Sequence, residues 1–213
     1  MDIKKDIVCI GGGVMSVTLA KLLHELDPKM DITIYEKLSS CALESSQSIN
    51  NAGTGHAGYC ELNYTPINRQ QIVNIDRALK INREFEVSLQ FWSFLTKKYK
   101  SFKPKSFITQ VPHISFVKGE KDISFLKKRY EALSKTLSFK GMQFSSNLET
   151  IKKWAPLIGD ISKDNIAMTR AEYGSDVNFE SLSHQMLKIL SANKKFFVHA
   201  NHEIKSISQA KDK

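Results

Sequence analysis

Residues near the N-terminus have the types and the spacing needed to bind a dinucleotide. Gly11, Gly13 and Ser16 form the pattern Gly-x-Gly-x-x-Ser. In such a pattern the first glycine makes a tight turn, the second lets the backbone approach a pyrophosphate, and the third position allows close helix–strand contact. Phosphate oxygens would then meet free N–H groups at the positive end of a helix dipole. Glu36 adds a carboxylate that can accept hydrogen bonds from both ribose hydroxyls of an adenosine.

The segments around these residues match the elements that such a site requires. A short β-branched run over 6–10 ends at the glycines and predicts a buried strand. Apolar residues at helical spacing predict a helix over 14–26, which Asp27-Pro28 ends. A second strand is expected over 31–37, so the order is β-α-β with parallel strands. A Gly-x-Gly pattern alone is weak, but together these features favour a dinucleotide site over a structural turn.

The stretch after the second strand favours FAD over NAD. A Glu at this strand end excludes the 2′-phosphate of NADP but allows NAD. A simple NAD-binding unit would supply another helix and strand soon after Glu36. The chain instead has a Ser/Asn/Gly-rich stretch over 44–66, ESSQSINNAGTGHAGYCELNYTP, which can cover a pyrophosphate and reach an isoalloxazine ring. The candidate FAD-binding residues are Gly11, Gly13, Val14, Met15, Ser16, Glu36, Lys37, Ser45, Ser46, Asn51, Gly53, Thr54, Gly55 and His56.

Composition is that of a soluble protein with a substantial core. Of the 213 residues, 41% are hydrophobic and 25% are charged. The net charge of +9 favours anionic partners, although solvated lysine-rich helix faces explain it more simply. No zinc-finger spacing or aromatic-interleaved basic stripe supports nucleic-acid binding. Cys9, Cys41 and Cys60 form no CxxC pair, which predicts a reduced compartment, and we interpret Cys60 as a packed residue rather than a reactive thiol.

The remaining chain alternates between predicted helices and strands. A helix over 74–98 should bury an apolar stripe of Ile81, Phe85, Leu89, Trp92 and Leu95. The uncharged run over 7–20 is too short to span a bilayer. The further expected elements are a strand or hairpin arm over 106–119, helices over 122–137, 148–158 and 180–193, a strand followed by a turn over 165–179, and strands over 195–209.

Taken together, these segments resemble the malate:quinone oxidoreductase family from about Asp6 to Phe197. The most specific block is Asn-Asn-Ala-Gly-Thr-Gly-His-Ala followed by Glu-Leu-Asn-Tyr-Thr-Pro. More remotely, the Ser-Ser…His-Ala-Gly pattern is similar to flavin dehydrogenases that act on hydroxy acids and glycerol phosphate. The other segments that carry the resemblance are IGGGVMSVTLAKLL, ITIYEKL, ALKINREFEVSLQFWSFL, VPHISFVKG, FLKKRYEALS, WAPL and TRAEYGSDVNFESL.

The resemblance implies an α/β fold. It comprises an FAD-binding Rossmann-like domain of the glutathione-reductase/D-amino-acid-oxidase type and an α+β substrate domain. The expected division is 1–100 for FAD binding, 101–180 for substrate binding and 181–213 for a return to the FAD-binding domain. Family members are about twice this long, so we expect the chain to correspond to their N-terminal part, with the C-terminal half of the fold absent.

The resemblance also implies a function. The family uses non-covalent FAD to oxidise (S)-malate to oxaloacetate by hydride transfer to flavin N5, and delivers the electrons to membrane quinone in the tricarboxylic acid cycle. Such an enzyme, a malate dehydrogenase (quinone), is peripheral on the inner face of the bacterial cytoplasmic membrane. Two alternatives stay open. One is another FAD-dependent 2-hydroxyacid or amino-acid oxidoreductase, and the other is a non-catalytic remnant that binds adenine nucleotide.

Oxidation of a 2-hydroxy acid needs a base for the hydroxyl proton and cations for the carboxylates. His56, among glycines that allow close backbone approach, is the candidate base, with loop or cofactor positioning as the alternative. His113 is a second candidate, unless it is a packed strand histidine. Arg170 is the candidate carboxylate partner because a guanidinium binds a carboxylate in bidentate fashion, and a surface salt bridge is its alternative.

The other histidines and arginines are expected to have no chemical role. We interpret Arg69, Arg77, Arg83 and Arg129 as loop or helix-face charges, and His24, His184, His199 and His202 as helix-face or strand-end residues. His199 and His202 are close in sequence, but no third ligand at metal-binding spacing accompanies them, so no metal site is predicted.

Overall fold

A computed structural model describes residues 5–55, 57–161 and 165–209. The chain divides into two compact units. Unit 1 comprises 1–53, 94–108 and 177–213, and unit 2 comprises 54–93 and 109–176. Residues 54–93 therefore belong with unit 2, whereas the division expected from the sequence grouped them with the first part of the chain.

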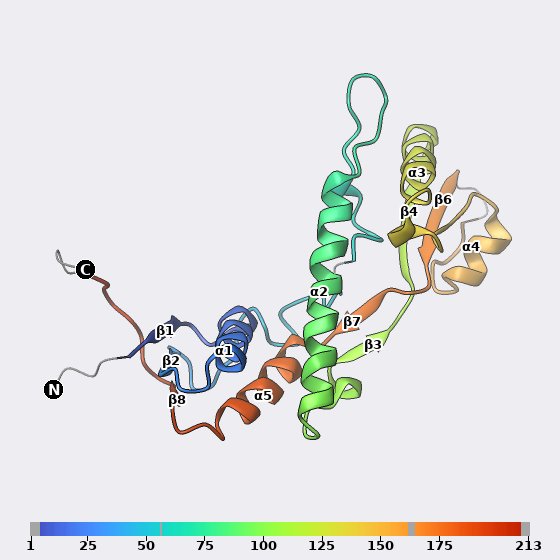
Figure 1. The fold of residues 1–213 in the computed structure, drawn as a ribbon. Coiled ribbons are helices and arrows are strands. Elements are labelled where there is room, and N and C mark those ends of the chain that lie inside the picture. The colour runs from blue at the N-terminus through green and yellow to red at the C-terminus, as the bar shows by residue number, and fades with distance from the viewer. Residues whose placement is uncertain (1–4, 56, 162–164, 210–213) are drawn as a thin grey trace. The chain divides into compact units, whose positions relative to one another are not determined.

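Unit 1 is built on a parallel sheet whose strand order is β1-β2-β8 (Figure 1). The register aligns Ile10 of β1 with Tyr35 of β2 and His199 of β8, so the carboxyl ends of the strands lie at one edge of the sheet. The β-α-β arrangement predicted for the first 37 residues is confirmed. The elements are β1 (Ile7–Ile10), α1 (Val14–Leu26), β2 (Ile32–Tyr35), α5 (Phe179–Leu190) and β8 (Phe196–His199).

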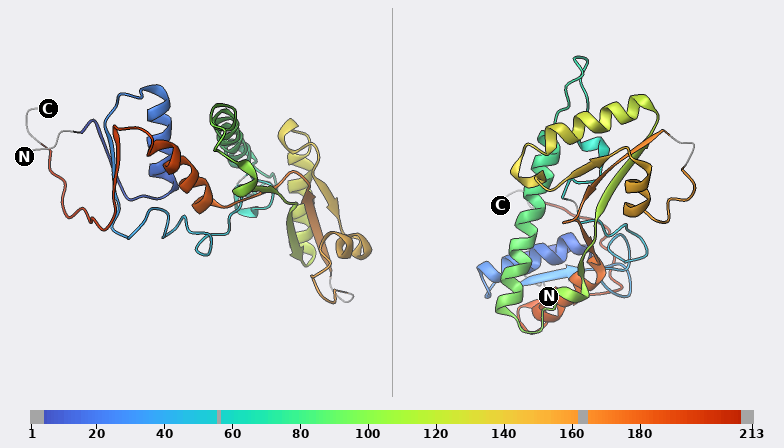
Figure 2. Two further views of the ribbon diagram at one scale, coloured as in Figure 1. Left: turned by 90° about the horizontal axis from the view of Figure 1, so that it is seen from below. Right: turned by 90° about the vertical axis from the view of Figure 1, so that its right-hand side faces the viewer.

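Unit 2 contains an antiparallel sheet in the order β4-β6-β5 (Figure 2). Ala167 of β6 packs with Leu126 of α3, whereas the next residue, Met168, packs with Ile151 of α4. Because neighbouring residues of a strand point to opposite faces, α3 and α4 cover different faces of this sheet. The elements are β4 (His113–Lys118), α3 (Glu120–Leu133), β5 (Gln143–Ser145), α4 (Leu148–Trp154) and β6 (Ile166–Ala171).

The remaining elements connect the units along the chain. Helix α2 (Asp76–Lys98) begins in unit 2 and its last turn belongs to unit 1. Trp92 and Leu95 of its predicted apolar stripe are buried, and Ile81, Phe85 and Leu89 are half-buried. Strands β3 (Ile108–Gln110) and β7 (Ser175–Val177) pair with each other, and short 3-10 turns cover Leu62–Tyr64, Pro104–Ser106 and Leu137–Phe139.

Several elements differ from those expected from the sequence. Strands were expected over 195–209, but β8 ends at His199, where Asn201 adopts a φ of 58° and its N–H bonds to Leu38 O. The helix expected over 122–137 ends at Leu133, where turns over 134–136 lead into a 3-10 turn over Leu137–Phe139. Strand β5 was missed because its three residues are too few for an alternating pattern to be visible.

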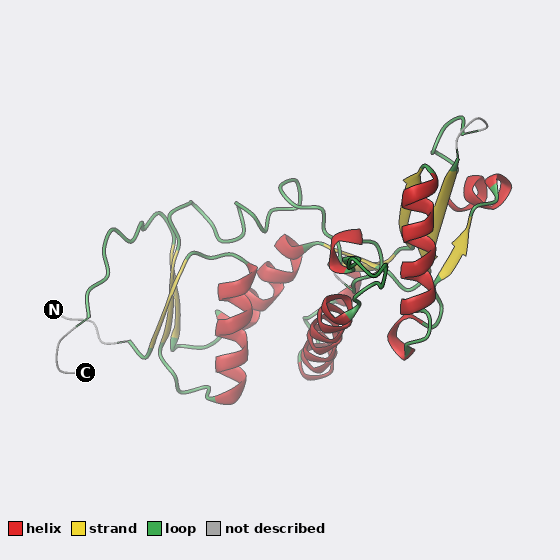
Figure 3. Cartoon of the chain, turned by 90° about the horizontal axis from the view of Figure 1, so that it is seen from above, coloured by secondary structure: helices red, strands yellow, loops and turns green. Residues whose placement is uncertain are grey.

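Helices α1 and α5 contact each other and lie on the same face of the unit 1 sheet (Figure 3). On α1, Val17 and Ala20 are fully buried, as expected for a helix on a sheet. Lys21 is also fully buried. A lysine is rarely fully buried unless its ammonium group is paired. In the described part of the chain, no helix combines the length and the apolarity that a bilayer crossing requires.

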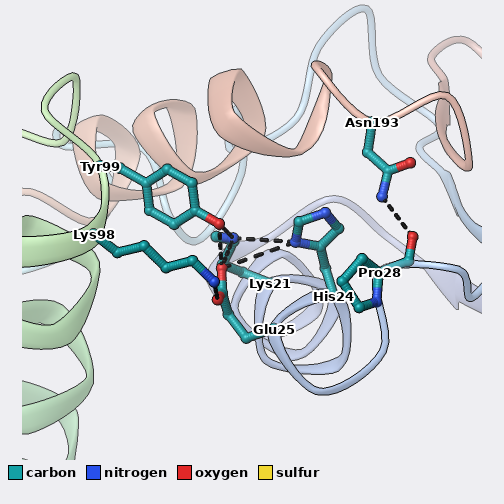
Figure 4. Close-up of polar contacts among 7 residues, drawn as sticks. All are labelled: Lys21, His24, Glu25, Pro28, Lys98, Tyr99 and Asn193. Carbon is teal, nitrogen blue, oxygen red and sulfur yellow. Dashed lines mark hydrogen bonds and ion pairs between the residues drawn. The ribbon is translucent and has the colours of Figure 1, made fainter.

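Lys21 is stabilised by a polar cluster at the carboxyl end of α1 (Figure 4). Its ammonium forms an ion pair with Glu25 and donates to Tyr99 Oη at 3.1 Å. Glu25 also accepts from Lys98 Nζ and from Tyr99 Oη, each at 2.6 Å. The cluster therefore ties α1 to Lys98, the last residue of α2, and to Tyr99 after it, both of which belong to unit 1. Burial raises the pKa of Glu25, but hydrogen bonds from Lys21, Lys98 and Tyr99 outweigh it and lower the pKa to about 2.

We predict that Glu25→Gln destabilises the protein by about 2 kcal/mol near neutral pH, after allowance for solvent screening. A carboxyl whose pKa is lowered on folding stabilises the protein above its unfolded pKa, and this stability is lost as the pH falls through the folded pKa. The difference from wild type should therefore shrink between about pH 4.5 and 2.

Urea unfolding followed by circular dichroism at several pH values measures this difference. The control is Glu84→Gln, which removes an exposed carboxylate 3.8 Å from Lys80 and should change stability by less than about 0.5 kcal/mol. A Glu25→Gln effect no larger than that of the control would show that the cluster adds nothing to stability.

Candidate functional site

A cleft of about 250 Å³ lies where α1 begins. It is at the carboxyl ends of β1 and β2, which is where ligands bind in open α/β sheets. Among the candidate residues, Gly11, Gly13, Val14, Met15, Ser16, Glu36, Ser45 and Ser46 line the cleft, together with Ile10, Gly12, Ala42, Leu43 and Glu44. The structure thus brings together residues from the glycine turn, the end of β2 and the Ser-rich loop.

The glycine turn depends on Gly11 and on a residue that the motif does not emphasise. Gly11 has a φ of +85°, a conformation that favours glycine. A Cβ on Gly12 would lie 2.4 Å from Cys41 Sγ, so only glycine fits there without movement. A Cβ on Gly13 would meet nothing closer than Ser46 Oγ at 3.4 Å. The protein's own packing therefore restricts Gly12, whereas the space beside Gly13 is left for a ligand.

The start of α1 presents hydrogen-bond donors to the cleft. Its first turn contains no acidic residue, and no side chain among the described residues caps it at Gly13. The Val14 N–H donates to the buried Ser46 Oγ at 2.9 Å, which fixes the Ser-rich loop beside the turn. Since the helix dipole is positive at this end, the site favours a negatively charged group such as a phosphate.

Glu36 is held at the turn by two backbone groups. Its Oε2 accepts from the Gly12 N–H at 2.6 Å, and its Oε1 accepts from the Leu38 N–H at 2.8 Å. The side chain is buried apart from the part that lines the cleft. A carboxylate has about four acceptor positions, so two are left for the hydroxyls of a ribose.

A second cleft of about 310 Å³ adjoins the first, since the two share Ile10, Gly11, Glu36 and Glu44. It is lined in addition by Tyr35, Lys37, His202, Glu203 and Ile204. The Tyr35 and His199 rings stack at 4.9 Å, and the His202 N–H donates to Glu36 O at 2.8 Å. Lys37 forms an exposed ion pair with Glu44 at 2.9 Å. Lys37 thus lies in this neighbouring cleft and not in the first.

Sequence reasoning missed His202 to Ile204 as site residues. They follow β8, and the carboxyl end of a parallel strand is itself a signal for a ligand site. The interpretation of 195–209 as continuous strand concealed that end.

Asn51 and Gly53 do not line either cleft. The Asn51 amide donates to Ser45 O and Gln47 O at 3.1 and 2.8 Å, and its Oδ1 accepts from the Gly53 N–H at 2.8 Å. These bonds fold the loop on itself, and Gly53 adopts a φ of 62°. In this structure the two residues shape the loop that carries Ser45 and Ser46.

Thr54 and Gly55 belong to unit 2. Thr54 forms a β-bridge with Asp176, and the Gly55 N–H donates to Ser175 O at 2.7 Å. A Cβ on Gly55 would lie 2.8 Å from the Phe85 ring, so this glycine is required by packing within unit 2. The candidate base, His56, lies outside the described residues.

His113 and Arg170 lie on opposite faces of the unit 2 sheet. His113 pairs with Ala171 in the register, and Ile114 pairs with Arg170. Paired residues share a face and successive residues alternate, so the two side chains point apart. The structure does not bring these two candidate catalytic residues together.

The two side chains also differ in their surroundings. The His113 ring is buried, its Nε2 accepts from the Ser175 N–H at 3.2 Å, and its Nδ1 lies 3.8 Å from Cys60 Sγ. A Cβ on Gly174 would lie 2.2 Å from the ring. Arg170 is partly exposed and forms an ion pair with Glu172 at 3.1 Å. Its buried Nε makes no hydrogen bond among the described residues.

The interpretation of Arg129 as a helix-face charge was wrong. Arg129 is 0% exposed, and its guanidinium donates to Thr65 Oγ1 at 3.0 Å and to Gly58 O and Tyr59 O at 3.1 and 3.0 Å. Burial lowers its pKa to about 10, so it stays charged near neutral pH. Arg129 shares a helix face with Leu126 and Leu133, a spacing that could have indicated its burial from sequence.

The cysteines are protonated packing residues. Burial raises the pKa of Cys41 to about 11 and that of Cys60 to about 12. This supports the interpretation of Cys60 as a packed residue rather than a reactive thiol, because a thiol with such a pKa is a poor nucleophile. Among the described residues, no three His, Cys, Asp or Glu side chains come together in a way that could hold a metal ion.

Comparison with known proteins gives these clefts a family context. The family model described as "Malate:quinone oxidoreductase (Mqo)" matches residues 3–213. The chain belongs to the malate:quinone oxidoreductase family. This confirms the resemblance inferred from the 44–66 stretch and from the segments before and after it.

Individual relatives agree with the family assignment. A "Probable malate:quinone oxidoreductase" from Serratia proteamaculans (strain 568) is 45% identical over 209 residues, which are 97% of this chain and 40% of the relative. The same name is given to a relative from Bacillus cereus (strain Q1), 44% identical over 100% of this chain and 43% of the relative. The chain therefore spans well under half the length of these relatives.

Solved structures with this fold include an oxidase with FAD bound. The L-α-glycerophosphate oxidase from Mycoplasma pneumoniae with FAD bound matches with a TM-score of 0.64 at 17% identity, over 99% of this chain and 48% of that one. The glycine oxidase from Bacillus cereus ATCC 14579 matches with a TM-score of 0.61 at 16% identity, over 98% and 49%. At these identities the likeness shows the fold alone, and it confirms the predicted FAD-binding Rossmann-like class.

We predict that Gly12→Ala destabilises unit 1 by about 1–3 kcal/mol, because the new methyl group overlaps Cys41. The matched control is Gly13→Ala, whose φ of −73° suits any residue and whose methyl group has room. It should change stability by less than about 1 kcal/mol. Thermal unfolding by circular dichroism compares the two variants, and equal stabilities would contradict the proposed overlap.

We predict that Arg129→Met destabilises unit 2 by about 3 kcal/mol, since Gly58 O and Tyr59 O lose their buried donor. Trp92 and Trp154 both belong to unit 2, so urea unfolding followed by tryptophan fluorescence reports on this unit. Arg83→Met on the exposed side of α2 is the control and should have a small effect. An Arg129→Met variant as stable as this control would show that the buried guanidinium does not stabilise the 58–65 segment.

Proposed function

We propose that this protein serves in the FAD-dependent oxidation of (S)-malate to oxaloacetate, with electrons passed to a quinone. The observation that carries the proposal is the family match over 3–213. Relatives named for this activity at 44–47% identity support it. Because the chain spans 40–43% of these relatives, the activity of the whole protein is part of the proposal.

The residues of unit 1 fit FAD. The start of α1 would hold the pyrophosphate, and Ser45 and Ser46 would supply hydroxyls beside it. Glu36 has acceptor positions left for the adenosine ribose, and the adjoining cleft beside Tyr35 and His202 has room for the adenine ring. We therefore assign FAD binding to unit 1 and substrate binding to unit 2, in place of the division at residues 100 and 180.

Each candidate side chain has a proposed role in malate oxidation. Bound FAD supplies the hydride acceptor. His56 would accept the hydroxyl proton of malate. Arg170, partly exposed and with an Nε that makes no hydrogen bond among the described residues, would bind a carboxylate. His113 lies on the face of the sheet opposite to Arg170. We therefore propose that His113 holds residues 59–60 and 175, which its ring contacts, in position.

The location of the protein is likewise a proposal. A quinone that resides in the membrane requires contact with the membrane surface. The net charge of +9 would attract the anionic headgroups of the inner leaflet. We propose peripheral attachment to the inner face of the cytoplasmic membrane, as for a tricarboxylic acid cycle enzyme, with no nucleic-acid partner.

The proposal predicts that the purified protein, incubated with FAD, retains a flavin absorption at about 450 nm that anaerobic (S)-malate bleaches. Gly13→Ala should keep the fold but weaken FAD binding about tenfold or more, because the methyl group occupies the space of the pyrophosphate.

Glycine, L-proline and glycerol phosphate are the comparison substrates. Bleaching by one of these but not by malate would favour the alternative of a different FAD-dependent oxidoreductase. Retained FAD that no substrate reduces would favour the non-catalytic alternative. Loss of FAD from wild type and Gly13→Ala alike would contradict the assigned cofactor site.

A further inference from the structure

Positive charge is concentrated in one segment of unit 1. Residues 97–105, KKYKSFKPK, contain five lysines, and the longer stretch over 87–119 contains no acidic residue. The segment comprises the end of α2 and the 3-10 turn at Pro104–Ser106, and all of it belongs to unit 1. The net charge of +9 is therefore unevenly distributed along the chain.

Aromatic residues anchor this segment while its lysines stay in solvent. Phe102 and Phe107 are 1% and 3% exposed, and their ring centroids lie 5.1 Å apart. Two turns keep the backbone compact, since the Phe102 N–H donates to Tyr99 O and the Phe107 N–H donates to Pro104 O, each at 2.9 Å. The exposed lysines on this fixed backbone are Lys97, Lys98, Lys100, Lys103 and Lys105.

Helix α5 lies beside the segment and adds two further lysines. Gln185 of α5 accepts from the Lys103 N–H at 2.5 Å, and its amide donates to Lys103 O at 3.3 Å. Lys188 is exposed and shares a face of α5 with Gln185, because the two are three residues apart. Lys194 follows α5, is exposed, and lines a cleft together with Tyr99.

Little negative charge opposes these lysines. The Lys98 ammonium reaches Glu25 at 2.6 Å, as Figure 4 shows, and is neutralised there. Among the described residues, no carboxylate forms an ion pair with the other six, here called the lysine face: Lys97, Lys100, Lys103, Lys105, Lys188 and Lys194. Such a group of unneutralised ammonium ions attracts an anionic partner.

An apolar side chain lies next to the lysine face. Phe94 is 45% exposed, and the Lys98 ammonium lies 5.6 Å from the centre of its ring. Phe94 and Lys97 are three residues apart on α2 and therefore share a face of that helix. An exposed aromatic ring beside lysines is typical of a helix that lies at the boundary between lipid headgroups and acyl chains.

We infer that the lysine face, together with Phe94, docks onto an anionic lipid surface. The negative potential of such a surface attracts each nearby lysine, and this attraction decays within a Debye length. The inference rests on the proposed function, which attaches the protein to a membrane, and it names the part of unit 1 that makes the attachment.

Nucleic acid suits the lysine face less well than lipid does. Proteins that bind single strands combine a basic surface with aromatic rings on which the bases stack. The rings of Phe102 and Phe107 are buried, so they are closed to bases. The lysine face offers charge without a stacking platform, which is what a layer of lipid headgroups requires.

Vesicle flotation tests the inference and needs neither FAD nor malate. The 213-residue protein is mixed with vesicles that contain phosphatidylglycerol or with vesicles of phosphatidylcholine alone. We expect it to float with the anionic vesicles only. The binding should weaken about tenfold or more when the salt concentration rises from about 0.05 M to about 0.5 M, because salt screens exposed charges.

A fourfold substitution locates the contact. Removing four charges of the lysine face should weaken binding to the anionic vesicles about tenfold or more. The variant carries Lys97→Gln, Lys100→Gln, Lys103→Gln and Lys105→Gln. The matched control removes the same charge from exposed lysines of unit 2 and should weaken binding by less than about threefold. It carries Lys121→Gln, Lys127→Gln, Lys140→Gln and Lys152→Gln. Circular dichroism checks that both variants are folded.

Fluorescence gives a second readout that leaves the net charge unchanged. Phe94→Trp places an indole at the proposed contact, where bromine atoms on the lipid acyl chains can quench it at short range. Leu137→Trp is the control, because Leu137 is exposed in unit 2. Vesicles of brominated phosphatidylglycerol should quench Phe94→Trp more strongly than Leu137→Trp.

Three results would overturn the inference. The first is wild-type protein that does not float with anionic vesicles. The second is equal weakening in the two fourfold variants, with equal quenching of the two tryptophan variants. The third is tighter binding to single-stranded DNA than to anionic vesicles at the same salt concentration, lost in the lysine-face variant, since nucleic acid would then be the partner.

Failure of the inference and failure of the proposed function are distinguishable. A flavoprotein that malate reduces but that does not bind the vesicles would contradict the docking surface and leave the oxidation of malate supported. Binding through the lysine face by a protein whose flavin malate does not reduce would contradict the proposed oxidation and leave the docking surface supported.

Discussion

The hydrogen bond from the Gly12 N–H to the Glu36 carboxylate lies where the segments that line the first cleft meet. Gly12 belongs to the turn between β1 and α1, and Glu36 follows β2. Through its backbone, Glu36 also accepts from the His202 N–H after β8, and Gly12 O accepts from the Ala42 N–H in the loop. The segments around residues 12, 36–42 and 202, which are distant in sequence, therefore meet at one turn. Cys41 leaves no room for a larger residue at Gly12, so the contact requires glycine.

Helix α1 is fixed at the end that does not face the cleft. At its carboxyl end, Lys21 and Glu25 form a buried cluster with Tyr99 and Lys98. At its amino end, the Val14 N–H bonds to Ser46, and the first turn is otherwise open to the cleft. A helix held in this way keeps its dipole and its N–H groups in place before a ligand arrives, which lowers the ordering cost of binding.

The sequence was informative where local rules determine structure, and much less so where distant contacts do. The turn at Gly11, the helix over 14–26 and the position of Glu36 after the second strand follow from a motif in which strand, turn and helix are neighbours. The restriction on Gly12 comes from Cys41, a contact that no local pattern reveals. His113 and Arg170 lie on opposite faces of their sheet because of the strand register, and this register is fixed only when β4 and β6 pair.

Both units constrain the stretch over 44–66. Its first part, through Ser45 and Ser46, lines the cleft of unit 1. Its second part is clamped within unit 2, where Arg129 donates to Gly58 O and Tyr59 O. A surface loop that met neither requirement could vary freely in sequence. A segment rich in Ser, Asn and Gly is thus held in place at both ends, by the cleft lining of unit 1 and by a buried guanidinium of unit 2.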